Sequence, residues 1–247
     1  MPETDVDIRT RDGTADCFLA YPEHAGPHPA VVYIPDIRGP RPVFKDMARR
    51  LASDGYAVLM PNLFYRVGRA PVWNIPDSTQ SEAGRARVSE LFAAVTVDGC
   101  HRDHVAFLDY LTSIPEIAEQ RTAEVGYCMG GAIAMRAAAD FPDRIIAAAS
   151  FHGGRLATDQ PDSPHLRAKD LRAVLYFGHA ADDASMTPEM IEKLEAALDA
   201  VHVHYTTDHY TARHGYAVAD SPAYDEAAAE FHWTRLVKFL REALGRR

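Results

Sequence analysis

Short apolar segments alternate with helix-forming segments along most of this sequence, and this alternation is the feature that most restricts its fold. Most of these segments are apolar at consecutive positions, which predicts strands that are buried on both faces. The predicted strands are residues 30–34, 57–60, 123–127, 145–151, 173–177 and 201–205. Strands of this kind, separated by helices, are typical of a mostly parallel sheet covered by helices on both sides. The sequence therefore predicts an α/β fold.

The remaining segments complete this prediction. Residues 6–10 and 17–21 flank an Asp12-Gly13 turn and predict an antiparallel pair at the N-terminus. The predicted helices are residues 43–53, 81–94, 102–112, 130–140, 188–200 and 224–244. The proline-rich residues 61–76 predict a long loop after a strand, on the side where such sheets place their ligands. Without a repeat or a composition break, residues 1–247 are expected to form one domain.

The composition excludes several classes of function. The chain has 35 acidic and 26 basic residues and a formal charge of −9, which disfavours nucleic acid as a partner. Its N-terminus lacks the basic start and apolar run of a secretory signal, and no apolar stretch reaches the ~18–20 residues of a membrane helix. We therefore expect a soluble cytoplasmic protein, as a monomer or a homodimer, with no membrane partner.

The three cysteines, Cys17, Cys100 and Cys128, are too few and too widely spaced for a disulfide framework or a Cys-x-x-Cys metal site. No metal or cofactor is expected. Cys17 and Cys100 are interpreted as small, partly buried thiols.

Cys128 lies in the pattern Gly126-Tyr127-Cys128-Met129-Gly130, between a predicted strand and a predicted helix. This is the setting of a nucleophile elbow, in which the nucleophile occupies a sharply turned position and the flanking glycines let strand and helix backbones approach. The dipole of the following helix would favour the thiolate that attacks carbonyl groups. We interpret Cys128 as the nucleophile; a buried cysteine in a glycine-rich turn is the alternative.

A base and an acid are expected later in the chain, each on a loop after a strand. His214 precedes the final predicted helix and is the preferred base, with His209 as the nearby alternative. Asp182 and Asp183 follow the predicted strand at residues 173–177, and either one would orient the histidine.

The oxyanion formed during hydrolysis needs backbone donors, for which the sequence offers Met129 after the nucleophile and Ile37 in the loop after the strand at residues 30–34. Asp36 is expected to face the site and to orient the thiol, or else to form a turn at the end of the strand. Aromatic and cationic side chains in and near residues 61–76 are expected at the rim of the site, where the arginines could bind an anionic substrate. They are Tyr65, Arg66, Arg69 and Trp73, with Arg85 and Arg87 as further cations. For any one of these arginines, a surface role is the favoured alternative.

These motifs resemble the dienelactone hydrolase (carboxymethylenebutenolidase) family over about residues 30–240. The matching segments are Gly126–Gly131, Phe151-His152-Gly153, the Asp183 loop and His214-Gly215-Tyr216-Ala217. The resemblance implies an α/β-hydrolase fold without a large cap and a Cys128-His214-Asp183 triad. It selects Asp183 over Asp182, because the family places an apolar residue, here Met186, three positions after its acid.

Two departures bear on the substrate. The type members have a glutamate where this chain has Asp36, and an arginine for the substrate carboxylate where this chain has Val218. The resemblance therefore implies hydrolysis of a small ester or lactone, with dienelactone as one candidate. A thioesterase or other acyl hydrolase with the same triad, and a non-catalytic ligand-binding protein of the same fold, are the alternatives.

Overall fold

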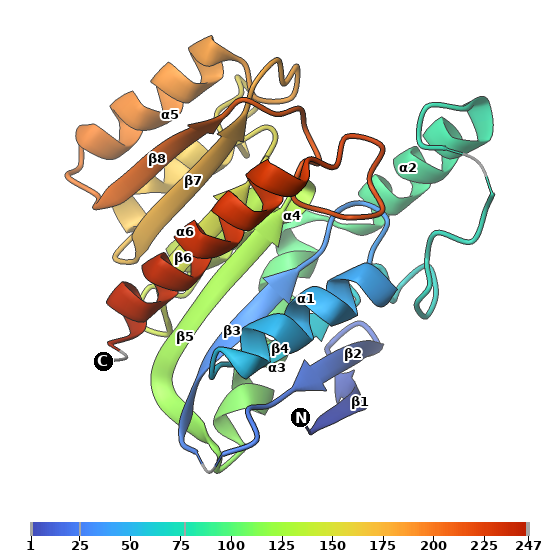
Figure 1. Ribbon diagram of the computed structural model, residues 1–247, viewed down its shortest axis with the longest axis vertical. Helices are drawn as coiled ribbons and strands as arrows, with labels where there is room; N and C mark the ends of the chain where they lie inside the picture. The colour runs from blue at the N-terminus through green and yellow to red at the C-terminus, as the bar shows by residue number, and fades with distance from the viewer. Residues whose placement is uncertain (1, 25, 77, 246–247) are drawn as a thin grey trace.

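The computed structural model describes residues 2–24, 26–76 and 78–245, and within them all strands join one eight-stranded sheet (Figure 1). The order across the sheet is β1-β2-β4-β3-β5-β6-β7-β8; β1–β2 and β2–β4 are antiparallel pairs and the others are parallel. The strands are β1 (Glu3–Arg9), β2 (Thr14–Ala20), β3 (His28–Ile34), β4 (Ala57–Pro61), β5 (Ile117–Tyr127), β6 (Ile145–Phe151), β7 (Val174–Ala180) and β8 (Tyr205–Tyr210). The predicted mostly parallel sheet and the N-terminal antiparallel pair are confirmed.

Helices cover both faces of this sheet. They are α1 (Pro42–Ser53), α2 (Glu82–Ala94), α3 (Val97–Thr112), α4 (Met129–Asp140), α5 (Pro188–Asp199) and α6 (Glu226–Leu244), with a short 3₁₀ helix, η1 (Pro164–Asp170). In Figure 1, α1 and α6 lie on one face, whereas α3 and α4 lie on the other. None of the helices within the described ranges is long and apolar enough to cross a membrane.

The strands supply both core layers because successive side chains of a strand point to opposite faces. In β3, Val31 and Tyr33 pack in the layer under α1 and α6, whereas Val32 and Ile34 pack in the layer under α3, α4 and α5. All four side chains are fully buried. The continuous apolar segments of the sequence are thus central strands with two buried faces.

One predicted strand is wrong. Residues 201–204 form the turn that follows α5, in which the N–H groups of His202 and Val203 donate to Asp199 and Leu198. The strand is instead β8, which lies at the edge of the sheet and therefore accommodates the polar run Thr206-Thr207-Asp208. A polar edge strand lacks the apolar pattern by which the central strands were predicted.

Other elements differ from the prediction at their starts; β1 and β2, for example, each begin three residues early, at Glu3 and Thr14. Helix α3 begins at Val97 instead of residue 102, because the Thr96 hydroxyl caps it by accepting a hydrogen bond from the Gly99 N–H. Strand β5 begins six residues before the apolar segment at Ala123. The described residues between β4 and α2 that follow Pro61 contain no helix or strand, so the predicted long loop is confirmed.

The junction of β5 and α4 requires glycine. A Cβ atom on Gly126 would overlap the carbonyl oxygen of Gly130, and one on Gly130 would lie 2.6 Å from the carbonyl oxygen of Ile34. Both obstacles are backbone atoms, which cannot move away as a side chain can. Strand β5 can therefore meet α4 only without a side chain at Gly126, and α4 can pass the end of β3 only without one at Gly130.

We expect Gly126→Ala to lower the free energy of unfolding by about 3 kcal/mol or more, because the added methyl group displaces the β5–α4 junction. Urea denaturation followed by circular dichroism measures this change. The matched control is Gly68→Ala, where an added Cβ meets nothing within 4 Å, and the expected effect is within about 0.5 kcal/mol. Equal stability of the two variants would contradict the requirement.

Candidate active site

Cys128 occupies the sharp turn between β5 and α4. Its φ of 56° and ψ of −122° lie in a region that residues with a side chain rarely adopt. Its N–H donates to the carbonyl of Phe151 at 3.1 Å, and its own carbonyl accepts from the Gly131 N–H at 3.1 Å. These bonds hold a strained backbone that presents a half-buried thiol at the carboxyl edge of the sheet.

His214 and Asp183 come from two other loops at the same edge. Asp183 follows β7 and His214 follows β8, and the His214 Nδ1 atom lies 2.7 Å from the Asp183 Oδ2 atom. The second carboxylate oxygen of Asp183 accepts from the Ser185 N–H at 2.9 Å and from its hydroxyl at 2.6 Å. Burial raises the pKa of Asp183, but the bonds to His214 and Ser185 outweigh it and lower the pKa.

The alternatives that the sequence left open are placed elsewhere. Asp182 is exposed, with a φ of 52°, and His209 is an exposed residue within β8 whose ring contacts that of His179. Asp183 and His214 are the pair that the structure brings together. Ser185, which supports Asp183, was not singled out in the sequence.

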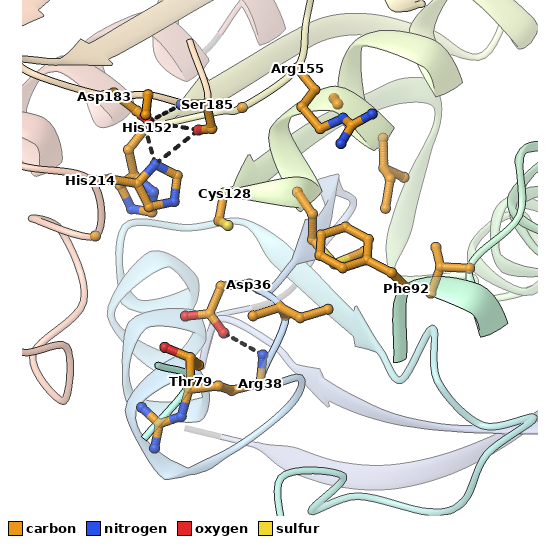
Figure 2. A pocket seen from close by; sticks show the side chains of 18 of the residues that line it. Asp36, Arg38, Thr79, Phe92, Cys128, His152, Arg155, Asp183, Ser185 and His214 are labelled. Carbon is orange, nitrogen blue, oxygen red and sulfur yellow. Dashed lines mark hydrogen bonds and ion pairs between the residues drawn. The ribbon is translucent and has the colours of Figure 1, made fainter. Parts of the chain in front are cut away.

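The His214 ring is held in its charged form. Burial lowers its pKa, but hydrogen bonding with Asp183 and with the Cys128 side chain, together with their charges, raises the pKa to about 10. In Figure 2 the Cys128 side chain lies between His214 and Phe92. At neutral pH the Cys128 side chain therefore faces an imidazolium.

A second histidine packs against this ring. His152 is 1% exposed, and its ring centroid lies 5.0 Å from that of His214 in an edge-on contact. Neither of its ring nitrogens has a hydrogen-bond partner among the described residues. Burial, and then the charge of His214, lower the pKa of His152 well below its usual value, so this neighbour stays neutral.

The predicted backbone donors lie on two elements: Ile37 is in the loop after β3, and Met129 is the first residue of α4. Ile37 and Met129 both line the cavity above Cys128. Neither N–H donates to an acceptor in the described part of the chain. Two unpaired donors beside a thiol are the arrangement that an oxyanion requires.

Asp36 does not orient the thiol as expected. Its two carboxylate oxygens accept from the Arg41 guanidinium at 2.7 and 2.8 Å, and one of them also accepts from the Arg38 N–H at 2.9 Å. Arg41 also binds both carboxylate oxygens of Asp220, at 2.7 and 2.9 Å. The alternative interpretation of Asp36 as a turn residue is thus the better one, and the same carboxylate anchors Arg41. Arg41, which the sequence did not indicate, joins the loop after β3 to the loop that carries His214.

The side chains expected at the rim lie outside the cavity lining. Arg66 pairs with Asp103 and Asp12, and the Tyr65 hydroxyl donates to Asp103 at 2.8 Å. Arg69 pairs with Asp7 of β1, and Arg85 and Arg87 bind nearby backbone carbonyls. Trp73 packs behind the cavity wall, against the cluster of Phe64, Val72, Leu91 and Met129. The predicted placement at the rim is wrong because Arg66 and Arg69 pair with carboxylates that are far away in the sequence.

A cavity of about 720 Å³ opens over Cys128. Its lining includes four arginines, of which three have partners: Arg38 and Arg41 with Asp220, and Arg136 with the carbonyl of Asp162. Arg155 is exposed, and its guanidinium has no partner among the described residues; Figure 2 shows it extending into the pocket. Arg155 follows β6, and that position at the carboxyl edge of the sheet was the signal that could have identified it.

Comparison with known proteins identifies the family. Residues 15–244 match the model of the dienelactone hydrolase family. The chain belongs to this family. It is 28% identical to a provisionally named carboxymethylenebutenolidase of Escherichia coli K12, over 97% of this chain and 87% of the relative. It is 27% identical to the carboxymethylenebutenolidase of Rhodococcus opacus, over 92% and 86% of the two chains.

A solved structure gives the same result. The crystal structure of a provisionally named dienelactone hydrolase from Klebsiella pneumoniae superposes with a TM-score of 0.86 and 25% identity, over 98% of each chain. The resemblance found in the motifs is confirmed, as is the α/β-hydrolase fold without a large cap. A dienelactone hydrolase family member is a carboxylic ester hydrolase, so the protein is a hydrolase of the ester or lactone type.

The raised pKa of His214 has a measurable consequence for stability. Because the pKa is about 10 in the folded protein and ~6.5 when unfolded, the charged ring stabilises the fold fully below pH ~6.5 and progressively less up to pH ~10. We expect the loss of unfolding free energy in His214→Gln to be largest near pH 6 and to shrink as the pH rises to 10. Urea titrations across this range measure it, with exposed His204→Gln as the control. A loss that grows with pH would contradict the assignment.

Proposed function

We propose that this family member hydrolyses esters or lactones through a triad of Cys128, His214 and Asp183, with a thioester intermediate. The observation that supports it best is the 2.7 Å contact of His214 with Asp183, beside a thiol that is held in a strained turn. The order nucleophile, acid, base along the chain is that of the α/β hydrolases. In the proposed reaction, each of these side chains has a role in a particular step.

In the first half of the reaction, the Cys128 sulfur, whose proton has passed to His214, attacks the carbonyl carbon as a thiolate. The carbonyl oxygen becomes an oxyanion that the Ile37 and Met129 N–H groups stabilise. The His214 imidazolium then gives its proton to the leaving oxygen as the carbon–oxygen bond breaks. This step leaves an acyl group on Cys128 and a neutral imidazole. In a lactone, the leaving alcohol remains attached to the acyl group.

In the second half, neutral His214 takes a proton from water as that water attacks the thioester carbonyl. The carbon–sulfur bond breaks, the acid is released, and the thiolate and imidazolium are restored. Asp183 keeps the ring oriented through Nδ1 and stabilises its positive charge in both halves. Neutral His152 adds no second charge beside the ring as its protonation changes.

The test combines turnover with mass spectrometry. With p-nitrophenyl acetate we expect a transient mass increase of one acetyl group on Cys128, and a loss of turnover of about a thousandfold or more in Cys128→Ala and in His214→Gln. Cys17→Ala is the matched control, since Cys17 is 4% exposed and burial raises the pKa of its thiol. Iodoacetamide should label Cys128 before Cys17 or Cys100. Turnover that survives in His214→Gln would instead indicate a ligand-binding protein with incidental thiol reactivity. Preferential turnover of a thioester substrate in the same assay would indicate a thioesterase.

The structure also suggests how an anionic substrate would bind. Val218, at the position where type members have an arginine, is fully buried in the core under α6, so its loop presents no cation there. We propose that Arg155, whose guanidinium has no partner in the described residues, binds a substrate carboxylate instead. A charge-assisted hydrogen bond contributes ~1.5–3 kcal/mol, which corresponds to a factor of about 10 to 150.

Two lactones that differ only by a carboxylate test this proposal. In Arg155→Gln, we expect the kcat/KM of the carboxylated lactone relative to the neutral one to fall about tenfold or more. Arg69→Gln removes an arginine that pairs with Asp7 away from the cavity, and it should leave the ratio unchanged. An unchanged ratio in Arg155→Gln would contradict the role.

A further inference from the structure

The cavity extends well past the triad on the side away from His214. Its volume of about 720 Å³ falls within the range of ~300–1,000 Å³ that suits drug-sized ligands. Polar groups line the wall on the His214 side, where Asp183 and Ser185 lie. The opposite wall contains an apolar patch, which lies beside polar residues such as Thr96 and Arg136. We name this patch the acyl arm; it consists of Phe92 and Val95 of the α2 end, Val97 of α3, and Ala132 and Ile133 of α4.

The acyl arm is continuous with the nucleophile. Ala132 and Ile133 lie about one turn of α4 after Cys128, so the elbow that positions the thiol also positions this wall. Val95, Ile133 and Cys128 all pack against one cluster of buried side chains. An apolar group attached to a carbonyl at Cys128 would therefore enter the arm directly.

Phe92 forms an unusual part of the wall. Its side chain is 44% exposed although it lines a cavity, and Figure 2 shows its ring on the far side of Cys128 from His214. Helix α2 buries only Gly84 and Leu91, so burial against the rest of the protein does not explain why Phe92 is apolar. An apolar ligand in the arm would cover this ring and remove its surface from water.

The chemistry of the triad decides which part of a substrate lies in the arm. His214 gives its proton to the leaving oxygen, so the leaving group must lie on the His214 side of Cys128. The acyl substituent then points away from His214, which is the direction of the acyl arm. The arm would thus select among acyl groups and not among leaving alcohols.

We propose that the preferred substrates are esters whose acyl group is apolar and larger than acetyl, bound in the acyl arm; this inference rests on the proposed thiol hydrolase function. Each methylene group moved from water into such a wall contributes ~0.8 kcal/mol, or about a fourfold gain in kcat/KM if the contact is realised in the transition state. The acyl arm is thus the specificity-determining part of the cavity.

The experiment compares p-nitrophenyl acetate, butyrate and hexanoate, whose leaving group is the same. In the parent protein we expect kcat/KM to rise about two- to fourfold per added methylene group. Ala132→Leu fills the arm, and it should lower the hexanoate-to-acetate ratio about tenfold or more. Phe92→Ala removes the exposed ring and should lower the ratio about threefold or more. The ratio is the readout, because effects common to both esters cancel.

The matched control is Phe231→Ala, a truncation at a similarly exposed ring (49%) on α6, outside the cavity lining. It should leave the ratio unchanged. Suppose that acetate turnover depends on Cys128, but the hexanoate-to-acetate ratio of the parent is near one and neither Ala132→Leu nor Phe92→Ala changes it. That result would overturn this inference and leave the proposed function standing. Absence of Cys128-dependent turnover on any of these esters would instead overturn the proposed function. If Ala132→Leu does not fold, Phe92→Ala decides, because its exposed side chain can be truncated with little loss of packing.

Discussion

The close approach of β5 and α4 is the constraint on which the site depends. The α4 backbone leaves no room for a Cβ atom at Gly126, and the end of β3 leaves none at Gly130. Between these glycines Cys128 takes a backbone conformation that is costly for any residue with a side chain. Two backbone hydrogen bonds at Cys128 offset this cost. The same turn directs the thiol to the carboxyl edge of the sheet and sets α4, with Ala132 and Ile133, as one wall of the cavity.

Ionic contacts between loops then hold the other groups in place around the thiol. Asp183 connects the loop after β7 to His214 after β8, and Arg41 connects the loop after β3 to Asp220, which lies beyond His214 in the loop after β8. Each contact joins residues that are far apart in the sequence but adjacent at one edge of a parallel sheet. The buried, bidentate geometry of Arg41 favours a fixed distance between the loop that carries Ile37 and the loop that carries His214. Ionic contacts thus determine how the loops that carry Ile37, Asp183 and His214 lie relative to each other.

The sequence predicted the central strands of the sheet well. It predicted the edge strand and the starts of some helices and strands less well. The central strands were found because burial on both faces gives a continuous apolar run, as in β3. Strand β8 was misplaced because an edge strand tolerates Thr206-Thr207-Asp208, whereas the apolar residues just after α5 form a turn. The start of α3 was placed too late because its first turn depends on a threonine cap instead of an apolar periodicity.

The sequence by itself determined the fold class and the sharp turn at Cys128, since both depend on local backbone conformation and burial. Only the tertiary structure decided what the charged side chains contact. Arg66 is neutralised by Asp103, Asp36 by Arg41, and Arg155 keeps a guanidinium without a partner in the described residues. The physical reason is that an ion pair depends on which distant loops meet, and a one-dimensional pattern of residues carries no measure of that distance.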